Sequence, residues 1–227
     1  MYDVQMTFRD RADAGRRLAE KLTEYRGDKT VICAIPRGGV PVGIEVAKRL
    51  GAGLDIIVPR KITIPQNPEA GYGAVTEDGV VVLNEPLVKE IGISKRQIQR
   101  HAQEVRTEIE RRLSLYRRYL PPADLKGRVA IIVDDGLASG FTMFAAVRSI
   151  EQRKASKVVI GVPVASGGAY DLVKPLVSEI TALVVSRGFS FAVASFYRNW
   201  YDLSDDEVVR LFRTWARERE EILPRKQ

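Results

Sequence analysis

The sequence has one cysteine and one histidine in 227 residues, and each scarcity excludes a class of site. A single cysteine, Cys33, cannot form an intrachain disulfide, and its place within an apolar run is typical of a buried small side chain. His101 has no second histidine or cysteine at metal-ligand spacing. A histidine-based zinc site and a Ser/His/Asp triad are therefore disfavoured.

Long apolar runs are also missing. No run approaches the length of a membrane span, and residues 1–10 lack the basic-then-apolar layout of a signal peptide. We therefore expect a cytoplasmic protein with no membrane partner. Low-complexity stretches and internal repeats are absent too, while 45% of the residues are hydrophobic and 29% are charged. This composition predicts one globular domain over residues 1–227.

The formal net charge is +7. Such a charge attracts nucleic acid, but it equally suits a small substrate rich in phosphate. Charge alone does not choose between these partners.

Short apolar runs alternate with helical patterns along most of the chain, which predicts an α/β fold with an open, mainly parallel sheet flanked by helices. The predicted strands are residues 30–35, 54–58, 129–133, 158–164 and 180–185. The predicted helices are residues 10–25, 40–50, 142–153 and 170–177, with a last helix that Ser204 caps.

This alternation is interrupted by an expected helical insertion at about residues 85–122. A capping box of Ser94 and Gln97 begins one long helix, which we expect to end at Pro121-Pro122. The preceding stretch, rich in Gly and Pro, indicates a mobile flap between strands. The helix carries Arg96, Arg100, Arg106, Arg111, Arg112, Arg117 and Arg118, interleaved with Glu104, Glu108 and Glu110. We interpret these charges mainly as a solvated, salt-bridged face in preference to a nucleic-acid surface.

The segment with the clearest chemistry is residues 129–142. A buried strand ends in two adjacent carboxylates, Asp134 and Asp135, and a loop of small residues then opens a helix. Open parallel sheets bind ligands at the carboxyl ends of their strands. Amides and hydroxyls of this loop can face a phosphate, and the acids can then hold sugar hydroxyls. The loop residues are Ala138, Ser139, Gly140, Phe141 and Thr142. They match neither a P-loop nor a GxGxxG turn.

This segment resembles the motif of the type I phosphoribosyltransferases, which has four apolar residues, two acids and a loop of Thr, Ser, Ala and Gly. Residues 34–43 look like the family's pyrophosphate loop, in which Arg37 gives charge while Gly38 and Gly39 allow close approach. The resemblance also implies a non-proline cis peptide near Arg37-Gly38.

Further segments extend this resemblance from about residue 8 to residue 212. Arg60 and Lys61 resemble the basic residues that reach the leaving diphosphate, and the stretch after them resembles the family's catalytic flap. Within that flap, Glu69 is a candidate residue for contact with the acceptor or with magnesium. The inserted helices resemble the family's variable hood over the base site.

The resemblance implies a Mg²⁺-dependent transfer of phosphoribosyl from phosphoribosyl pyrophosphate (PRPP) to a nucleobase-like acceptor, with release of diphosphate, as in nucleotide salvage. Asp134 and Asp135 would orient the ribose, residues 138–142 would bind the 5-phosphate, and Arg37, Arg60 and Lys61 would neutralise the leaving group. Mg²⁺ would be held mainly by PRPP and water, near Asp134 or Asp135. A homodimer is also implied.

One departure from the family pattern concerns the acceptor. Enzymes that act on 6-oxopurines usually carry an acid where this sequence has Ala138, so that chemistry is in doubt. An aromatic segment could stack on a planar base, although core or dimer packing is the favoured interpretation for most of its members. It comprises Phe189, Phe191, Phe196, Tyr197, Trp200 and Tyr201.

Two other hypotheses stay open. The chain could be a non-catalytic sensor of PRPP or of a nucleotide that binds nucleic acid, which the basic charge permits. Against this, only about 29 residues precede the first core strand, too few for a typical winged-helix domain, so nucleic acid is the less favoured partner. The other hypothesis is a phosphoribosyl-binding partner subunit without transfer activity of its own.

Overall fold

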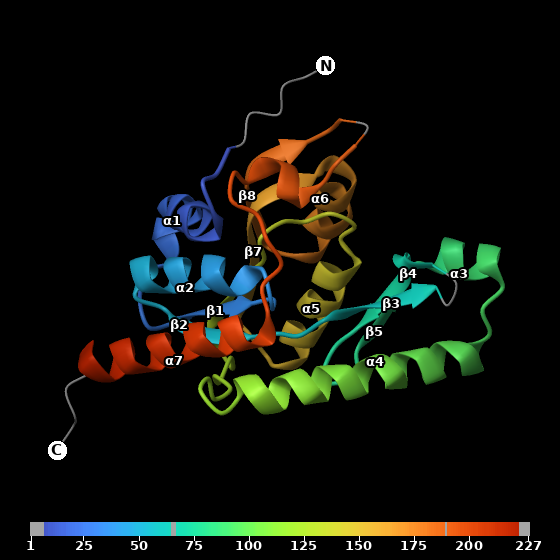
Figure 1. The fold of residues 1–227 in the computed structure, drawn as a ribbon, viewed down its shortest axis with the longest axis horizontal. Helices are drawn as coiled ribbons and strands as arrows, with labels where there is room; N and C mark the ends of the chain where they lie inside the picture. The colour runs from blue at the N-terminus through green and yellow to red at the C-terminus, as the bar shows by residue number, and fades with distance from the viewer. Residues whose placement is uncertain (1–6, 65–66, 189, 223–227) are drawn as a thin grey trace.

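A computed structural model describes residues 7–64, 67–188 and 190–222, without the side chains of residues 68, 69 and 220–222. At its centre is a parallel sheet with the strand order β2-β1-β6-β7-β8 (Figure 1). The strands are β1 (Thr30–Ala34), β2 (Gly53–Ile56), β6 (Val129–Val133), β7 (Lys157–Ser166) and β8 (Glu179–Ser186). The five predicted strands are thus confirmed, with ends shifted by one or two residues.

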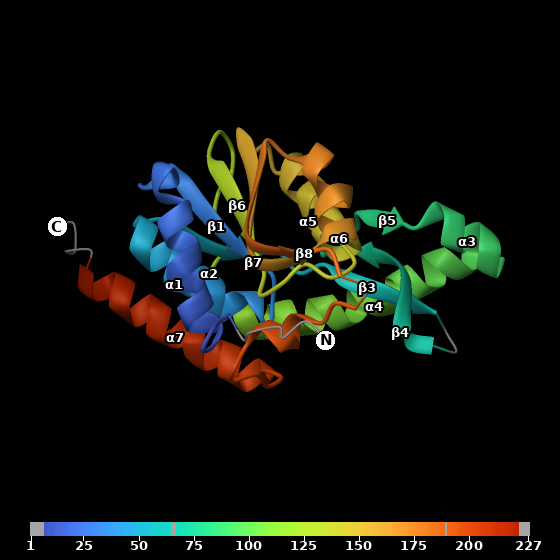
Figure 2. The same ribbon diagram turned by 90° about the horizontal axis from the view of Figure 1, so that it is seen from above.

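Helices cover both faces of this sheet, as Figure 2 shows. Helices α1 (Arg11–Lys21) and α2 (Gly39–Leu50) pack on one face, while α5 (Phe141–Gln152) and α6 (Gly167–Val173) pack on the other. Alternate residues of a strand point to opposite faces. Accordingly, Ile32 and Ala34 belong to one apolar core and Val31 and Cys33 to the other. The predicted α/β class is confirmed.

A second, antiparallel sheet extends to one side of the central sheet. It contains β3 (Arg60–Ile64), β4 (Asn67–Val75) and β5 (Val81–Leu83), in that order. Helices α3 (Glu85–Ile91) and α4 (Lys95–Tyr116) pack against it, and together these elements form the arm seen beside the central sheet in Figure 1. The stretch that we expected to be a mobile flap between strands consists largely of paired strands. Its glycines and prolines hide the alternation that is typical of a strand.

Helix α4 begins as predicted, with both hydrogen bonds of the Ser94 and Gln97 capping box. The prediction that it continues to Pro121-Pro122 was wrong, because it ends at Tyr116. Arg117 instead turns inward to the fully buried carboxylate of Asp55 and also donates to the carbonyl of Ile56, at 3.2 Å. Asp55 further accepts from Arg153 at 2.5 Å. The end of the arm is thereby fixed to β2 and α5.

The last helix, α7 (Asp205–Ile222), lies along α4 and α2. Its first turn has the predicted cap: the Glu207 amide donates to the Ser204 hydroxyl at 3.2 Å, and the Glu207 carboxylate accepts from the Ser204 amide at 2.8 Å. Short 3-10 turns complete the fold at Thr23–Tyr25, Lys174–Leu176 and Val193–Phe196. Among the described helices, none combines the length and the apolar character needed to cross a bilayer.

Candidate active site

The candidate site lies where the neighbouring strands β1 and β6 end. These strands pair in parallel from Thr30↔Val129 to Ala34↔Val133, so the loops that follow them begin side by side. The amide of Ile35 still donates to the carbonyl of Val133, at 2.8 Å. The sheet therefore brings the expected pyrophosphate loop next to the acidic pair.

The loop after β1 packs directly on the two acids. A Cβ atom on Gly38 would lie 1.9 Å from Oδ2 of Asp135, and one on Gly39 would lie 2.6 Å from the carbonyl oxygen of Val133. Only glycine permits this approach. The expected non-proline cis peptide is present in this loop and joins Pro36 to Arg37, one bond before Arg37-Gly38.

The acids themselves have different partners. Asp135 pairs with Arg11, whose Nε lies 2.8 Å from Oδ2, and the side chains of this ion pair are 14% and 8% exposed. Arg11 also donates to the carbonyl of Tyr201 at 2.8 Å, and its guanidinium lies 3.9 Å from the ring centre of Trp200. The Asp134 carboxylate accepts a hydrogen bond from the Asp135 amide, at 2.8 Å. Asp135 is thus fixed from α1, whereas Asp134 has no direct cationic partner among the described residues.

These environments perturb both carboxyl groups. Burial raises the pKa of Asp134 well above its ordinary value, and the neighbouring carboxylate of Asp135 raises it further. Burial also raises the pKa of Asp135, although the Arg11 guanidinium opposes this change. Carboxyl groups with raised pKa values at a strand edge are typical of a functional site and favour a cation or a hydroxyl donor as ligand.

The loop after Asp135 leads into the N-terminus of α5. Ala138 and Ser139 are exposed, and Gly140 has a φ of 83°, which side chains rarely adopt. No side chain among the described residues caps the first turn of α5, which begins at Phe141. Amides at such a helix start are available to an anion, and the helix dipole favours it. Residues 138–142 therefore lie where the sequence predicts a phosphate.

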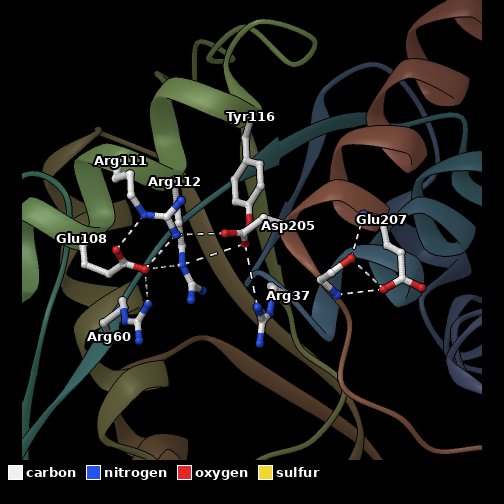
Figure 3. A network of polar contacts seen from close by, with 9 residues as sticks. Arg37, Arg60, Glu108, Arg111, Arg112, Tyr116, Asp205 and Glu207 are labelled. Carbon is white, nitrogen blue, oxygen red and sulfur yellow. Dashed lines mark hydrogen bonds and ion pairs between the residues drawn. The ribbon is translucent and has the colours of Figure 1, made fainter.

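An arginine cluster lies at the same edge, where the pyrophosphate loop, β3, α4 and α7 meet (Figure 3). We use this name for four arginines and the two carboxylates between them, namely Arg37, Arg60, Arg111, Arg112, Glu108 and Asp205. Glu108 lies 3.3 Å from Arg60, 2.8 Å from Arg111 and 3.1 Å from Arg112. Asp205 lies 2.9 Å from Arg111, 3.9 Å from Arg112 and 4.0 Å from Arg37. The tertiary fold thus joins Arg37 and Arg60, two predicted site residues.

Charges within the cluster shift its pKa values. Hydrogen bonds from Arg111 and Arg112 lower the pKa of Glu108 to about 2. Burial lowers the pKa of Arg60, and the positive charges of Arg112 and Arg37 lower it further, although Glu108 opposes them. The guanidinium groups therefore repel one another in spite of the carboxylates between them.

Two further predicted site residues, Lys61 and Glu69, are not among the residues of this cluster. Lys61 follows Arg60 on β3 and is exposed. Its side chain passes close over Gly71, where a Cβ atom would lie 2.2 Å from Cγ of Lys61. Successive strand residues point to opposite faces, which separates Lys61 from Arg60. The side chain of Glu69, on β4, lies outside the described residues. The roles of both remain predictions.

The aromatic segment packs mainly within the protein. Phe196 and Tyr197 are buried with Phe8, and the Tyr197 hydroxyl donates to the backbone carbonyl of Asp135 at 2.6 Å. Tyr201 is 56% exposed, whereas Phe189 lies outside the described residues. Core packing therefore accounts for most of the segment, and Tyr197 links it to the acidic pair.

Sequence reasoning missed Arg11 and interpreted Arg111, Arg112 and Glu108 as a solvated face. The side chain of Arg112 is only 14% exposed, so that interpretation is wrong for this residue. Asp205 follows the predicted cap Ser204 at the start of the last helix, and its contacts with the arginines were also missed. The spacing of Glu108 with Arg111 and Arg112 is a local helical pattern. No local pattern reveals the other two pairs, because Arg11 contacts a residue 124 positions away and Arg111 also contacts one 94 positions away.

A parallel α/β sheet with an acidic pair, a phosphate-type loop and a glycine loop at one edge is the architecture of a type I phosphoribosyltransferase. The model of the phosphoribosyl transferase domain family matches residues 7–195, and the chain belongs to this family.

A named relative agrees with this membership, and a solved structure is similar to the chain in sequence and fold. A Mycobacterium tuberculosis protein, provisionally named a phosphoribosyl transferase in two strains, is 41% identical over 202 residues. That match covers 89% of this chain and 45% of the relative, so the chain spans about half the length of the curated relatives it matches. A crystal structure from Thermus thermophilus is 39% identical, with a TM-score of 0.78, and the match covers 93% of this chain and 100% of that chain.

Proposed function

We propose that the chain is a Mg²⁺-dependent phosphoribosyltransferase that transfers phosphoribosyl from PRPP to a nucleobase-like acceptor. The observation that carries this proposal is the convergence of the glycine loop, the acidic pair and the uncapped start of α5 at one sheet edge. Family membership supports the reaction class.

The proposed binding mode assigns each part of PRPP to one element. The 5-phosphate binds the amides and hydroxyls of residues 138–142, at the start of α5. Asp134 and Asp135 face the ribose hydroxyls, and Arg37 and Arg60 face the diphosphate, with Lys61 as a further flap residue. Binding energy from the remote 5-phosphate then fixes the geometry at the reacting carbon.

In the proposed reaction, the bond from the ribose C1 to the diphosphate oxygen breaks, and its electron pair leaves with the diphosphate. A bond from C1 to an acceptor nitrogen forms, and the proton that this nitrogen carried is released to solvent. The acids stabilise the positive charge that develops on the ribose, and the arginines stabilise the negative charge on the leaving group. Glu69 belongs to the flap on the acceptor side in this proposal.

The residues present fit a magnesium ion that is held mainly by its ligand and water. Burial raises the pKa values of two adjacent carboxyl groups, Asp134 and Asp135. A nearby cation would stabilise their ionised forms. In the described part of the chain, no three His, Cys, Asp or Glu side chains are grouped as metal ligands. When bound, Mg²⁺ would neutralise diphosphate charge, and one or two carboxylates with substrate oxygens are its usual ligands.

The test is an incubation with PRPP, Mg²⁺ and a panel of purine and pyrimidine bases, in which diphosphate release and nucleotide formation are both measured. Release that requires one base, and that fails in Asp134→Asn, is expected. PRPP binding without base-dependent release across the panel would contradict transfer to a nucleobase. Gel filtration of the same preparation tests the proposed homodimer. The cytoplasmic location and the role in nucleotide salvage belong to the same proposal.

A further inference from the structure

The arginine cluster carries more positive charge than its carboxylates neutralise. Four guanidinium groups share the carboxylates of Glu108 and Asp205 (Figure 3). Glu207, which is near in sequence, is bound to Ser204 instead. With four positive and two negative side chains, the described residues of the cluster carry a net charge of +2.

Arg112 is the most enclosed of the four arginines. Its side chain is 14% exposed, whereas those of Arg37 and Arg60 are both 35% exposed and that of Arg111 is 52% exposed. Enclosing a charge is costly unless an anion compensates it. Both carboxylates near Arg112 are shared with other arginines. The cluster therefore favours an additional anion, and Arg112 is placed to bind it.

Three separate elements supply these charges. Arg37 belongs to the pyrophosphate loop, Arg60 begins β3, and Arg112 comes from the long helix α4 of the arm. Guanidinium groups bind phosphate oxygens in a fixed, often bidentate geometry. A diphosphate offers several charged oxygens and can contact all three arginines at once.

We propose that Arg112 binds the diphosphate of PRPP together with Arg37 and Arg60, so that the arm completes the diphosphate site. This inference rests on the proposed function and extends it to a residue outside the pyrophosphate loop and the flap. Asp205 has a defined part in it: its carboxylate orients Arg111 and Arg112, and its negative charge competes with the diphosphate for Arg37 and Arg112.

Calorimetric titration with inorganic diphosphate in the presence of Mg²⁺ tests the inference directly. Arg112→Gln removes one charged hydrogen-bond donor and is expected to weaken diphosphate binding about tenfold or more. Binding of ribose 5-phosphate, which lacks the diphosphate, is expected to stay unchanged. Arg100→Gln is the matched control, because it removes the same charge from the same helix at a side chain that is 67% exposed. Equal weakening by both variants would overturn the inference.

A second variant is expected to change diphosphate affinity in the opposite direction. This test does not depend on whether Arg112→Gln folds. Asp205→Asn removes a competing charge and is expected to tighten diphosphate binding severalfold at low salt. Weaker binding would mean that Asp205 only braces the cluster, which would contradict its competing role. Glu207→Gln, two residues further on, is the control and should leave the affinity unchanged.

The source of the diphosphate is tested with two further ligands. PRPP is expected to bind more tightly than ADP, and Arg112→Gln should weaken PRPP binding strongly. Tighter, Arg112-dependent binding of ADP would assign the cluster to a nucleoside diphosphate and overturn the choice of PRPP. Arg112-dependent diphosphate binding without any base-dependent turnover would contradict the transfer reaction alone. Turnover with unchanged diphosphate affinity in Arg112→Gln would overturn this inference alone.

Discussion

Replacing Asp134 by Asn is expected to stabilise the ligand-free protein while it abolishes turnover. Asp134 is a half-buried carboxyl group beside a second carboxylate, and both conditions raise its pKa above the ordinary value of 3.8. Asn keeps the shape of the side chain and can still accept the hydrogen bond from the Asp135 amide. Relief of a charge that is kept for function typically adds about 0.5–2 kcal/mol to the free energy of unfolding.

The gain should depend on pH in a defined direction. A carboxyl group whose pKa is raised by folding contributes stability below its unfolded pKa and loses it as pH rises through the folded pKa. Wild-type protein therefore loses this contribution toward pH 8, whereas Asp134→Asn does not. The difference between the two proteins should be largest at pH 8 and should fall toward zero near pH 4.

Urea denaturation at several pH values measures this difference, provided that the dependence on urea concentration is the same in both proteins. Asp135→Asn is the matched comparison. Burial raises the pKa of Asp135 as well, but the Arg11 guanidinium, 2.8 Å away, opposes this change, so the gain at pH 8 should be smaller than in Asp134→Asn. A loss of stability in Asp134→Asn at pH 8, or a gain that does not change with pH, would refute the argument.

Three further substitutions have expected outcomes. Gly38→Ala should weaken PRPP binding strongly in a titration, because its Cβ would lie 1.9 Å from Oδ2 of Asp135; Gly168→Ala, with no atom within 4 Å of the new Cβ, should not. Asp55→Ala should lower the free energy of unfolding by about 2–4 kcal/mol in urea, since it leaves two arginines without their shared carboxylate; a loss under about 1 kcal/mol would contradict this. Tyr72→Phe should cost about 1 kcal/mol in thermal unfolding, because the hydroxyl that bonds the chain's one histidine at 2.8 Å is lost; an unchanged melting temperature would count against it.

Much of the fold could be predicted because its patterns are local. Each central strand is an apolar run of the right length, and the capping box at Ser94 marks a helix start within four residues. The acidic pair and the small-residue loop after it are also contiguous, so the sequence alone indicated the residues that we propose bind the ribose and the phosphate. The antiparallel sheet of the arm was missed, because strands with glycine at close approaches lack a readable alternation.

The sequence by itself determined the α/β class, the succession of the central strands and helices along the chain, and the identity of the acidic pair and its loop. Only the tertiary structure decided that Arg11 holds Asp135, that Asp55 fixes the end of α4, and that Arg112 and Arg37 share the carboxylate of Asp205. The physical reason is the range of the interactions. Strand and cap patterns are set by neighbours in sequence, whereas ion pairs form between residues as far apart as 124 positions, which only the packed sheet and helices bring together.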